Sequence, residues 1–146
     1  MQVVDANGTD LTGLPDALPP LYEPLAEPCR LEISDDRELL RIGSSNWTAI
    51  CVDALTGEVW SVASLVPPGR RERWQDPRFM NSEVAAFGAC LDVARRSLPV
   101  TTGEGDTVAR AVRDKLRSID PPAMMDVDSF WNGFCDEVSL GDWGEA

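Results

Sequence analysis

Cys90 is the side chain of this sequence with the most obvious chemical potential. It lies in the stretch NSEVAAFGAC, where an Asn-Ser pair leads into an apolar run. A cysteine nucleophile needs a neighbouring base, and the usual base, histidine, is absent from all 146 residues. Cys90 also falls on the apolar stripe of an expected helix, where cysteine behaves as a small hydrophobic residue. We therefore interpret Cys90 as a core residue.

The absence of histidine excludes several classes of site. Ser-His-Asp and Cys-His catalysis both require it, and so do histidine-ligated metals. The four cysteines are Cys29, Cys51, Cys90 and Cys135. None of them forms the close Cys-x-x-Cys pair from which zinc sites are usually built. We expect reduced thiols, no metal and no cofactor.

Reduced thiols also indicate an intracellular protein. The first residues, MQVVDANGTD, show no basic region followed by an apolar one, as a secretory signal would. The apolar runs are too short to span a bilayer. We expect a cytoplasmic protein that binds no membrane.

Neighbouring carboxylates are the other candidates for catalysis. The closest pairs are Asp35/Asp36, Asp126/Asp128 and Asp136/Glu137. Such pairs can serve glycoside hydrolysis or metal-assisted hydrolysis. Here they fall in expected turns, at a helix end and on the polar face of a helix, which favours capping and solvated surface. No glycine-rich phosphate loop follows a strand. We therefore expect no catalytic residues and no enzyme.

The net charge of −12 is confined to the two ends of the chain. Residues 1–29 carry five acidic residues and residues 118–146 carry seven, and neither segment contains lysine or arginine. The middle of the chain carries 13 residues of each sign. Acidic ends repel nucleic acid and anionic membranes and attract basic partners. They also suit a surface that only aids solubility.

Aromatic residues gather beside the acidic C-terminal segment, at Phe130, Trp131, Phe134 and Trp143. Aromatic rings next to carboxylates suit a surface that binds a basic protein, and they equally suit a last helix docked on a sheet. The residues that we expect to contact a partner are Asp126, Asp128, Asp136, Glu137, Asp142 and Trp143.

One basic cluster, Arg70, Arg71 and Arg73, stands beside Trp74. Basic residues next to an aromatic ring can bind nucleic acid. Glu72 and Asp76 flank this cluster, which favours an ordinary solvated loop, and we expect no nucleic-acid partner.

Extended elements occupy the first half of the sequence. A proline-rich arm is expected over residues 1–28 and a single domain over 29–146. Strands are expected over 29–34, 37–45, 47–53 and 57–65, the last two joined as a hairpin by a turn containing Gly57. Both faces of this hairpin are apolar, so we expect it to be central in its sheet and covered on both sides.

Three helices are expected in the second half. The first starts after Asn81 or Ser82 as the cap, with Val84, Phe87, Leu91 and Ala94 on its apolar face. The second covers about 105–119, with Val108, Val112, Leu116 and Ile119 inward. The third covers about 127–139, capped by Asp126 or Asp128, with Val127 inward and Gly141 at its end. Strands followed by helices predict an α+β fold, with a mostly antiparallel sheet of about 4–6 strands packed against three or more helices.

Several local features occur together in this order. They are a strand ending at Ile42-Gly43, the strand–turn–strand ICVDALTGEVWSV around Gly57, and an Asn81-Ser82 entry to a helix that carries Phe87. A short helix with Trp131 and then Gly141-Asp142-Trp143 follow. Over residues 37–143 this pattern resembles the SUKH superfamily of bacterial immunity proteins, most closely its fourth subgroup. Two features depart from the family pattern: the bulky turn GSSNWT and the proline-rich arm.

The resemblance implies a fold shared with a fungal cell-wall-synthesis regulator. It also implies a function, because members are encoded beside polymorphic toxins and bind the toxin's C-terminal domain, commonly a nuclease or a nucleic-acid deaminase. We therefore expect an immunity protein that neutralises its cognate toxin by stoichiometric occlusion. The alternative is a general protein-binding or scaffold module of the same fold that acts on a regulatory partner.

Overall fold

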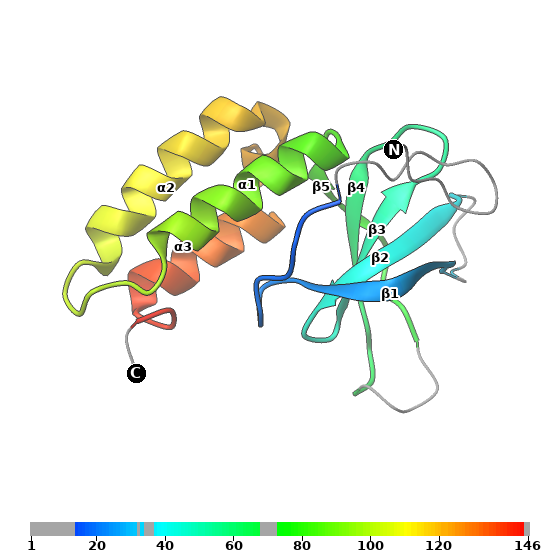
Figure 1. Ribbon diagram of the computed structural model, residues 1–146, viewed down its shortest axis with the longest axis horizontal. Coiled ribbons are helices and arrows are strands. Elements are labelled where there is room, and N and C mark those ends of the chain that lie inside the picture. The colour runs from blue at the N-terminus through cyan, green and yellow to red at the C-terminus, as the bar shows by residue number, and fades with distance from the viewer. Residues whose placement is uncertain (1–13, 32, 34–36, 68–72, 145–146) are drawn as a thin grey trace.

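Five strands and three helices form the protein, which is described here by a computed structural model for residues 14–31, 33, 37–67 and 73–144. The elements are β1 (Glu23–Arg30), β2 (Leu39–Ser45), β3 (Thr48–Asp53), β4 (Val59–Ala63), β5 (Arg78–Asn81), α1 (Val84–Ser97), α2 (Gly105–Ile119), the short 3-10 helix η1 (Pro121–Met124) and α3 (Phe130–Leu140). The sheet lies on one side of the molecule and the three helices lie side by side on the other (Figure 1). The predicted α+β class is confirmed.

The sheet is antiparallel throughout, with its strands in the order of the sequence, β1-β2-β3-β4-β5. The predicted hairpin is formed by β3 and β4, and β3 is the central strand. Its loop is held by the Asp53 carboxylate, which accepts hydrogen bonds from the backbone N–H groups of Leu55 at 2.8 Å and Thr56 at 3.2 Å. Gly57 completes the turn with a φ of +77°, a conformation that glycine adopts without strain.

The first strand differs from the expected one, since β1 begins at Glu23 and not at residue 29. It includes Pro24 and Pro28, which would break a central strand. A proline lacks the N–H donor, but β1 is the edge of the sheet, where one side of the strand needs no partner. The pairing with β2 also shifts register between Pro24 and Cys29. The expected boundary between arm and domain therefore lies within β1.

Gly43 allows β1 to approach β2 closely. A Cβ at this position would lie 2.6 Å from the backbone oxygen of Glu23 and 2.6 Å from the ring of Tyr22. No side chain fits such a space. Tyr22 is buried, and its hydroxyl donates to the backbone oxygen of Ile42 at 3.5 Å. Gly43 therefore attaches the segment before β1 to the rest of the fold.

The main core lies between the sheet and the helices. Ile50 and Val52 of β3 face it from the sheet, and Phe87 and Leu91 face it from α1. In α1 the predicted apolar face is confirmed: Phe87, Leu91 and Ala94 are buried and Val84 packs against them partly buried. In Figure 1, α1 and α3 run in the same direction and α2 runs in the opposite direction. Of the apolar face predicted for α2, Val112 and Leu116 are buried and Val108 is partly buried, but Ile119 is exposed at the end of the helix.

A second, smaller core covers the other face of the sheet. Ala49 and Cys51 of β3 pack there with Leu39 and Val62, and Trp60 and Trp74 lie against them. The Arg37 guanidinium stacks over the Trp60 ring with its carbon 3.7 Å from the ring centroid. Both faces of the central hairpin are thus covered, as its two apolar faces predicted.

The expected helix caps are wrong at two of the three helices. Helix α1 begins at Val84 after Glu83, which makes no side-chain capping bond, while Asn81 is the last residue of β5. Helix α3 begins at Phe130 and is capped by Ser129, whose hydroxyl accepts from the backbone N–H of Asn132 at 3.2 Å. The Asn81 side chain instead forms hydrogen bonds with buried side chains.

The start of α3 lies later than expected because Asp126, Val127 and Asp128 form a turn before it. In this turn the Asp126 carboxylate accepts from the backbone N–H of Asp128 at 2.9 Å, and Val127 is 77% exposed and not inward. The end of α3 is as predicted, since Gly141 closes it with a φ of +89°. Within the described residues, no helix has the length and apolar character needed to cross a bilayer.

Candidate functional site: an acidic and aromatic pocket beside the last helix

A buried polar network fixes the position of α3. The Asn81 side chain is fully buried at the end of β5, and its Oδ1 accepts from the Trp131 indole Nε1 at 2.8 Å. Its Nδ2 donates to Asp120 Oδ2 at 2.9 Å. Asp120 follows α2 and also accepts from the backbone N–H of Ser82 at 2.8 Å and from the Ser82 hydroxyl at 2.7 Å. The network therefore joins the sheet, the end of α2 and the start of α3.

A chain of ring contacts leads from the core to the surface beside α3. Phe87 of α1 lies 6.4 Å from Trp131, measured between ring centroids, and Trp131 lies 6.0 Å from Phe134. Phe134 in turn meets Trp143 in an edge contact at 5.3 Å. Phe130 also packs edge-on against Trp131 at 5.1 Å. Edge-on aromatic pairs stabilise defined orientations, so the partly buried rings of Phe130 and Trp143 are held by buried ones.

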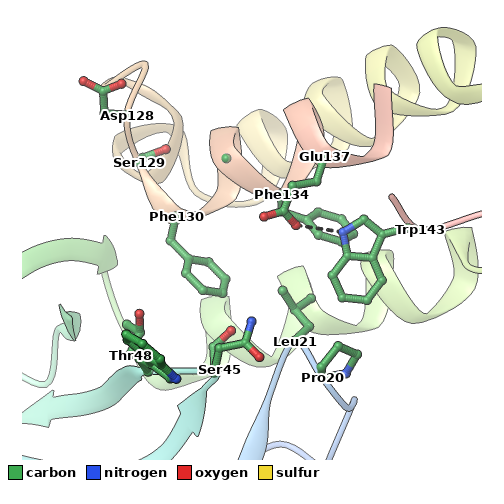
Figure 2. Close-up of a pocket in the computed structure, with 13 residues that line it drawn as sticks. Pro20, Leu21, Ser45, Thr48, Asp128, Ser129, Phe130, Phe134, Glu137 and Trp143 are labelled. Atoms are coloured by element: carbon green, nitrogen blue, oxygen red, sulfur yellow. Dashed lines mark hydrogen bonds between the residues drawn. The ribbon is translucent and has the colours of Figure 1, made fainter. Parts of the chain in front are cut away.

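A pocket of about 540 Å³ opens where these rings reach the surface. One wall is α3 with Trp143 after it, and the facing wall is the β2–β3 turn together with the segment before β1. Figure 2 shows Phe130 pointing from α3 towards Ser45 and Thr48, with Leu21 and Pro20 below Trp143. The lining residues are Pro20, Leu21, Ser45, Asn46, Trp47, Thr48, Asp128, Ser129, Phe130, Gly133, Phe134, Glu137 and Trp143. Segments from both ends of the chain therefore build one pocket.

Two acidic residues line this pocket; in Figure 2 the Glu137 carboxylate points into it towards Trp143, whereas the Asp128 carboxylate, at the other end of the lining, points outward. The Glu137 carboxylate accepts from the Trp143 indole Nε1 at 2.8 Å, and the described residues offer it no other hydrogen bond. The Asp128 carboxylate is exposed and accepts no hydrogen bond from the described part of the chain. No lysine or arginine is among the described residues that line the pocket. The pocket is thus negative with aromatic walls, which suits a positively charged group.

A smaller hollow of about 220 Å³ adjoins the pocket and shares Thr48, Asp128 and Phe130 with it. It extends towards Asp76 and Arg78 beside β5. The two hollows form one groove along the start of α3. A groove of this kind is longer than one side chain and suits an extended segment of a partner protein.

Three of the six residues expected to contact a partner lie together in the pocket, namely Asp128, Glu137 and Trp143. The other three lie outside its lining. Asp136 is paired with Arg113 of α2 at 2.7 Å, and Asp126 holds the turn before α3. Asp142 is exposed after α3, and its backbone N–H donates to the backbone oxygen of Glu137 at 3.0 Å.

The facing wall of the pocket was not anticipated. It includes Trp47, a large aromatic residue that is 51% exposed at the tip of the β2–β3 turn. Asn46 beside it has a φ of +53°, a left-handed conformation that asparagine tolerates better than most residues. The bulky turn GSSNWT, a departure from the pattern of the resembling family, was the signal in the sequence. Tryptophan is enriched among the residues that dominate binding at protein interfaces, which makes Trp47 a candidate contact residue.

The three buried cysteines do not form a reactive site. Cys51, Cys90 and Cys135 are buried, and burial raises the pKa of the Cys51 and Cys90 thiols to about 12 and that of Cys135 to about 11. These thiols are protonated near neutral pH. No three potential ligand side chains within the described ranges are grouped so as to hold a metal ion.

The basic cluster contributes little to the described structure. Arg73 is exposed, while Arg70 and Arg71 lie outside the described residues. The larger pocket beside α3, by contrast, combines acidic residues with aromatic walls and has no lysine or arginine in its described lining.

Comparison with protein families identifies the chain. The family model for the SUKH-4 immunity protein matches residues 11–137, which include all five strands, α1, α2 and most of α3. This match takes in the proline-rich segment before β1, which the resemblance over residues 37–143 did not include. Searches of curated proteins and of solved structures returned no significant match. Because the match covers most of its length, the chain belongs to the SUKH-4 immunity protein family.

Proposed function

We propose that this immunity protein neutralises a cognate toxin domain by binding it stoichiometrically, with the acidic and aromatic pocket beside α3 at the contact. The observation that carries the proposal is the composition of the pocket: Asp128 and Glu137 among the rings of Phe130, Phe134 and Trp143, without a basic residue in the described lining. Tight binding to a protein surface of opposite charge requires apolar anchors and unpaired charges of one sign.

The toxin that fits this surface is basic where it is bound. Nucleases and nucleic-acid deaminases bind their substrate through positively charged clefts, because the phosphate backbone dominates their affinity. An acidic inhibitor placed over such a cleft excludes the nucleic acid. The net charge of −12 also accelerates the encounter with a basic partner at low ionic strength. Inhibition by occlusion needs no catalytic group.

Co-expression with the toxin domain encoded beside this gene tests the proposal. We expect the full chain to restore growth and to co-purify with the toxin domain at moderate salt. The double variant D128N/E137Q removes both charges of the pocket with little change of shape. We expect it to bind the toxin domain about tenfold or more weakly, because each contact between unlike charges contributes more than 1 kcal/mol when it is desolvated.

The matched control is E38Q/D114N. It removes the same charge from exposed positions before β2 and on α2 that do not line the pocket. We expect nearly wild-type binding from this control at moderate salt. Equal binding by wild type, D128N/E137Q and the control would place the contact elsewhere on the protein. Failure of the wild-type chain to protect cells or to retain the toxin domain would refute the immunity function itself.

A further inference from the structure

The end of the pocket near Trp143 has a defined geometry. The Trp143 indole N–H donates to one oxygen of Glu137 at 2.8 Å, and its ring rests against Phe134 with centroids 5.3 Å apart. The backbone oxygen of Trp143 accepts from the backbone N–H of Val100 at 3.0 Å, which ties the C-terminal segment to the loop before α2. The carboxylate is therefore held in one orientation before any partner arrives.

The groups at this end define the chemistry of an occupant. The second oxygen of the Glu137 carboxylate accepts no hydrogen bond from the described residues, so it can receive one from a donor in the pocket. The rings of Phe130, Phe134 and Trp143 line the same pocket. An occupant must bring a positive charge, at least one N–H donor and a flat or apolar body. A negatively charged or purely polar group would be repelled or left unpaired.

On this basis, and given the proposed function, we propose that the pocket binds the side chain of an arginine from the partner protein. The guanidinium donates to Glu137 and lies against the aromatic rings, while the methylene groups cover Phe130. Asp128, at the other end of the lining, adds a second negative charge near the pocket. A volume of about 540 Å³ accommodates one long side chain with part of the backbone that carries it.

Arginine fits this arrangement better than lysine does. Its guanidinium is planar, stacks on aromatic rings and presents N–H donors in a fixed fork that matches a carboxylate. A lysine ammonium is a compact and strongly hydrated charge, which loses more hydration among aromatic rings. The pocket should therefore discriminate between two side chains of equal charge.

Blocked tripeptides probe this site in the full-length protein. The probes are acetyl-Gly-Arg-Gly-amide and its counterparts with lysine or with citrulline, which has the shape of arginine without its charge. The readout is the nuclear magnetic resonance signal of the Trp143 indole N–H. We expect the arginine peptide to shift this signal in the millimolar range and the citrulline peptide to leave it unchanged. The lysine peptide should bind about threefold or more weakly.

The variant E137Q supplies the decisive comparison. Its amide oxygen still accepts from the Trp143 indole, so the geometry is kept and the charge is removed. We expect its affinity for the arginine peptide to fall about tenfold. The signal of the buried Trp131 indole, which is bonded to Asn81, reports an intact fold and should not move. Equal binding of the citrulline peptide, an unchanged affinity in E137Q, or no shift at all would overturn the arginine pocket.

Failure of this inference is distinguishable from failure of the immunity function. If wild type and E137Q retain the toxin domain equally well, the arginine pocket is wrong and immunity by binding stands. If the wild-type chain does not bind the toxin domain, the proposed function fails whatever the peptides do. If E137Q loses affinity for the toxin domain and for the arginine peptide alike, both proposals are supported.

Discussion

Asn81 illustrates how one buried polar side chain determines the position of the functional surface. Its amide satisfies the Trp131 indole with its oxygen and Asp120 with its nitrogen. Trp131 in turn supports Phe130 and Phe134, which are walls of the pocket. The residue therefore influences the pocket without lining it.

The variant N81A should lower the free energy of unfolding by about 3 kcal/mol. It leaves the buried Trp131 indole N–H without an acceptor, which costs about 1–3 kcal/mol, and it also removes one of the three donors to the buried Asp120 carboxylate. The control S82A removes one bond to Asp120 from an exposed serine and should cost only about 1 kcal/mol. Urea unfolding measures both. Similar small losses would show that the network is not important for stability.

Thiol reactivity tests the burial of the cysteines. In the native protein we expect one cysteine, the exposed Cys29, to react quickly with a thiol reagent, and the other three to react only after unfolding. The variant C29A should have no fast-reacting thiol. Fast modification of Cys90 in that variant would contradict its assignment to the core.

The edge strand β1 is the element whose attachment is most sensitive to one residue. Strand β1 pairs with β2 at Pro24 opposite Gly43, where backbone and Tyr22 ring leave no space for a Cβ. This attachment also holds Pro20 and Leu21, which lie just before β1 and line the pocket. Stability and the shape of the pocket are thus linked through Gly43.

Two glycine substitutions should therefore have opposite effects. The variant G43A should lower the free energy of unfolding by about 2 kcal/mol, because the added methyl group overlaps backbone atoms that cannot move independently. The variant G88A lies within α1, where its Cβ would meet only Pro15 at 3.9 Å, and should raise stability by about 1 kcal/mol. Thermal unfolding of the two variants measures both changes of stability. A neutral G43A would mean that β1 can separate from β2 there.

The elements could be predicted from the sequence where a local pattern determined them. The period of Phe87, Leu91 and Ala94 gave α1, and the apolar alternation around Gly57 gave the hairpin of β3 and β4. Only the end of strand β1 is predicted from the sequence, because its prolines argue against a strand unless that strand is known to be an edge. The sequence predicts a helix cap at Asn81-Ser82, because the residues that the Asn81 side chain actually bonds, Asp120 and Trp131, are distant in the sequence.

Only one wall of the candidate site could be predicted from the sequence, because the other wall depends on contacts between distant segments. Asp128, Glu137 and Trp143 lie close in sequence, and their acidic and aromatic character was visible there. The facing wall, with Trp47 and Leu21, comes from segments about a hundred residues earlier, which only the fold brings alongside. A contact between distant segments leaves no periodic signal in a single sequence.

The net charge of the molecule as a whole favours a basic partner. Its stability depends on pH for a different reason, namely the burial of thiols and of Tyr22. Burial raises the pKa of Cys51 and Cys90 from 9.0 to about 12 and that of Tyr22 from 10.0 to about 12. Well below pH 9 these groups are protonated in the folded and the unfolded chain alike. Above it the unfolded chain loses protons first, so unfolding is favoured as the pH rises.

The free energy of unfolding should therefore fall from about pH 9 upward, by up to about 1.4 kcal/mol per pH unit for each buried thiol. Urea unfolding between pH 7 and pH 11 measures this slope. The variant C90A should have a smaller slope than the wild type. An identical slope in C90A and wild type would contradict the burial of the Cys90 thiol.

Titration of toxin activity by the purified full-length protein tests immunity by binding most directly. The toxin domain that the co-expression experiment identifies as the partner is held at a fixed concentration well above the dissociation constant, and its activity is followed as the protein is added. Stoichiometric occlusion predicts a linear loss of activity that is complete at the equimolar point, with D128N/E137Q requiring a clear excess. Full activity of the toxin at the equimolar point, or its inactivation by a small fraction of an equivalent, would contradict neutralisation by binding.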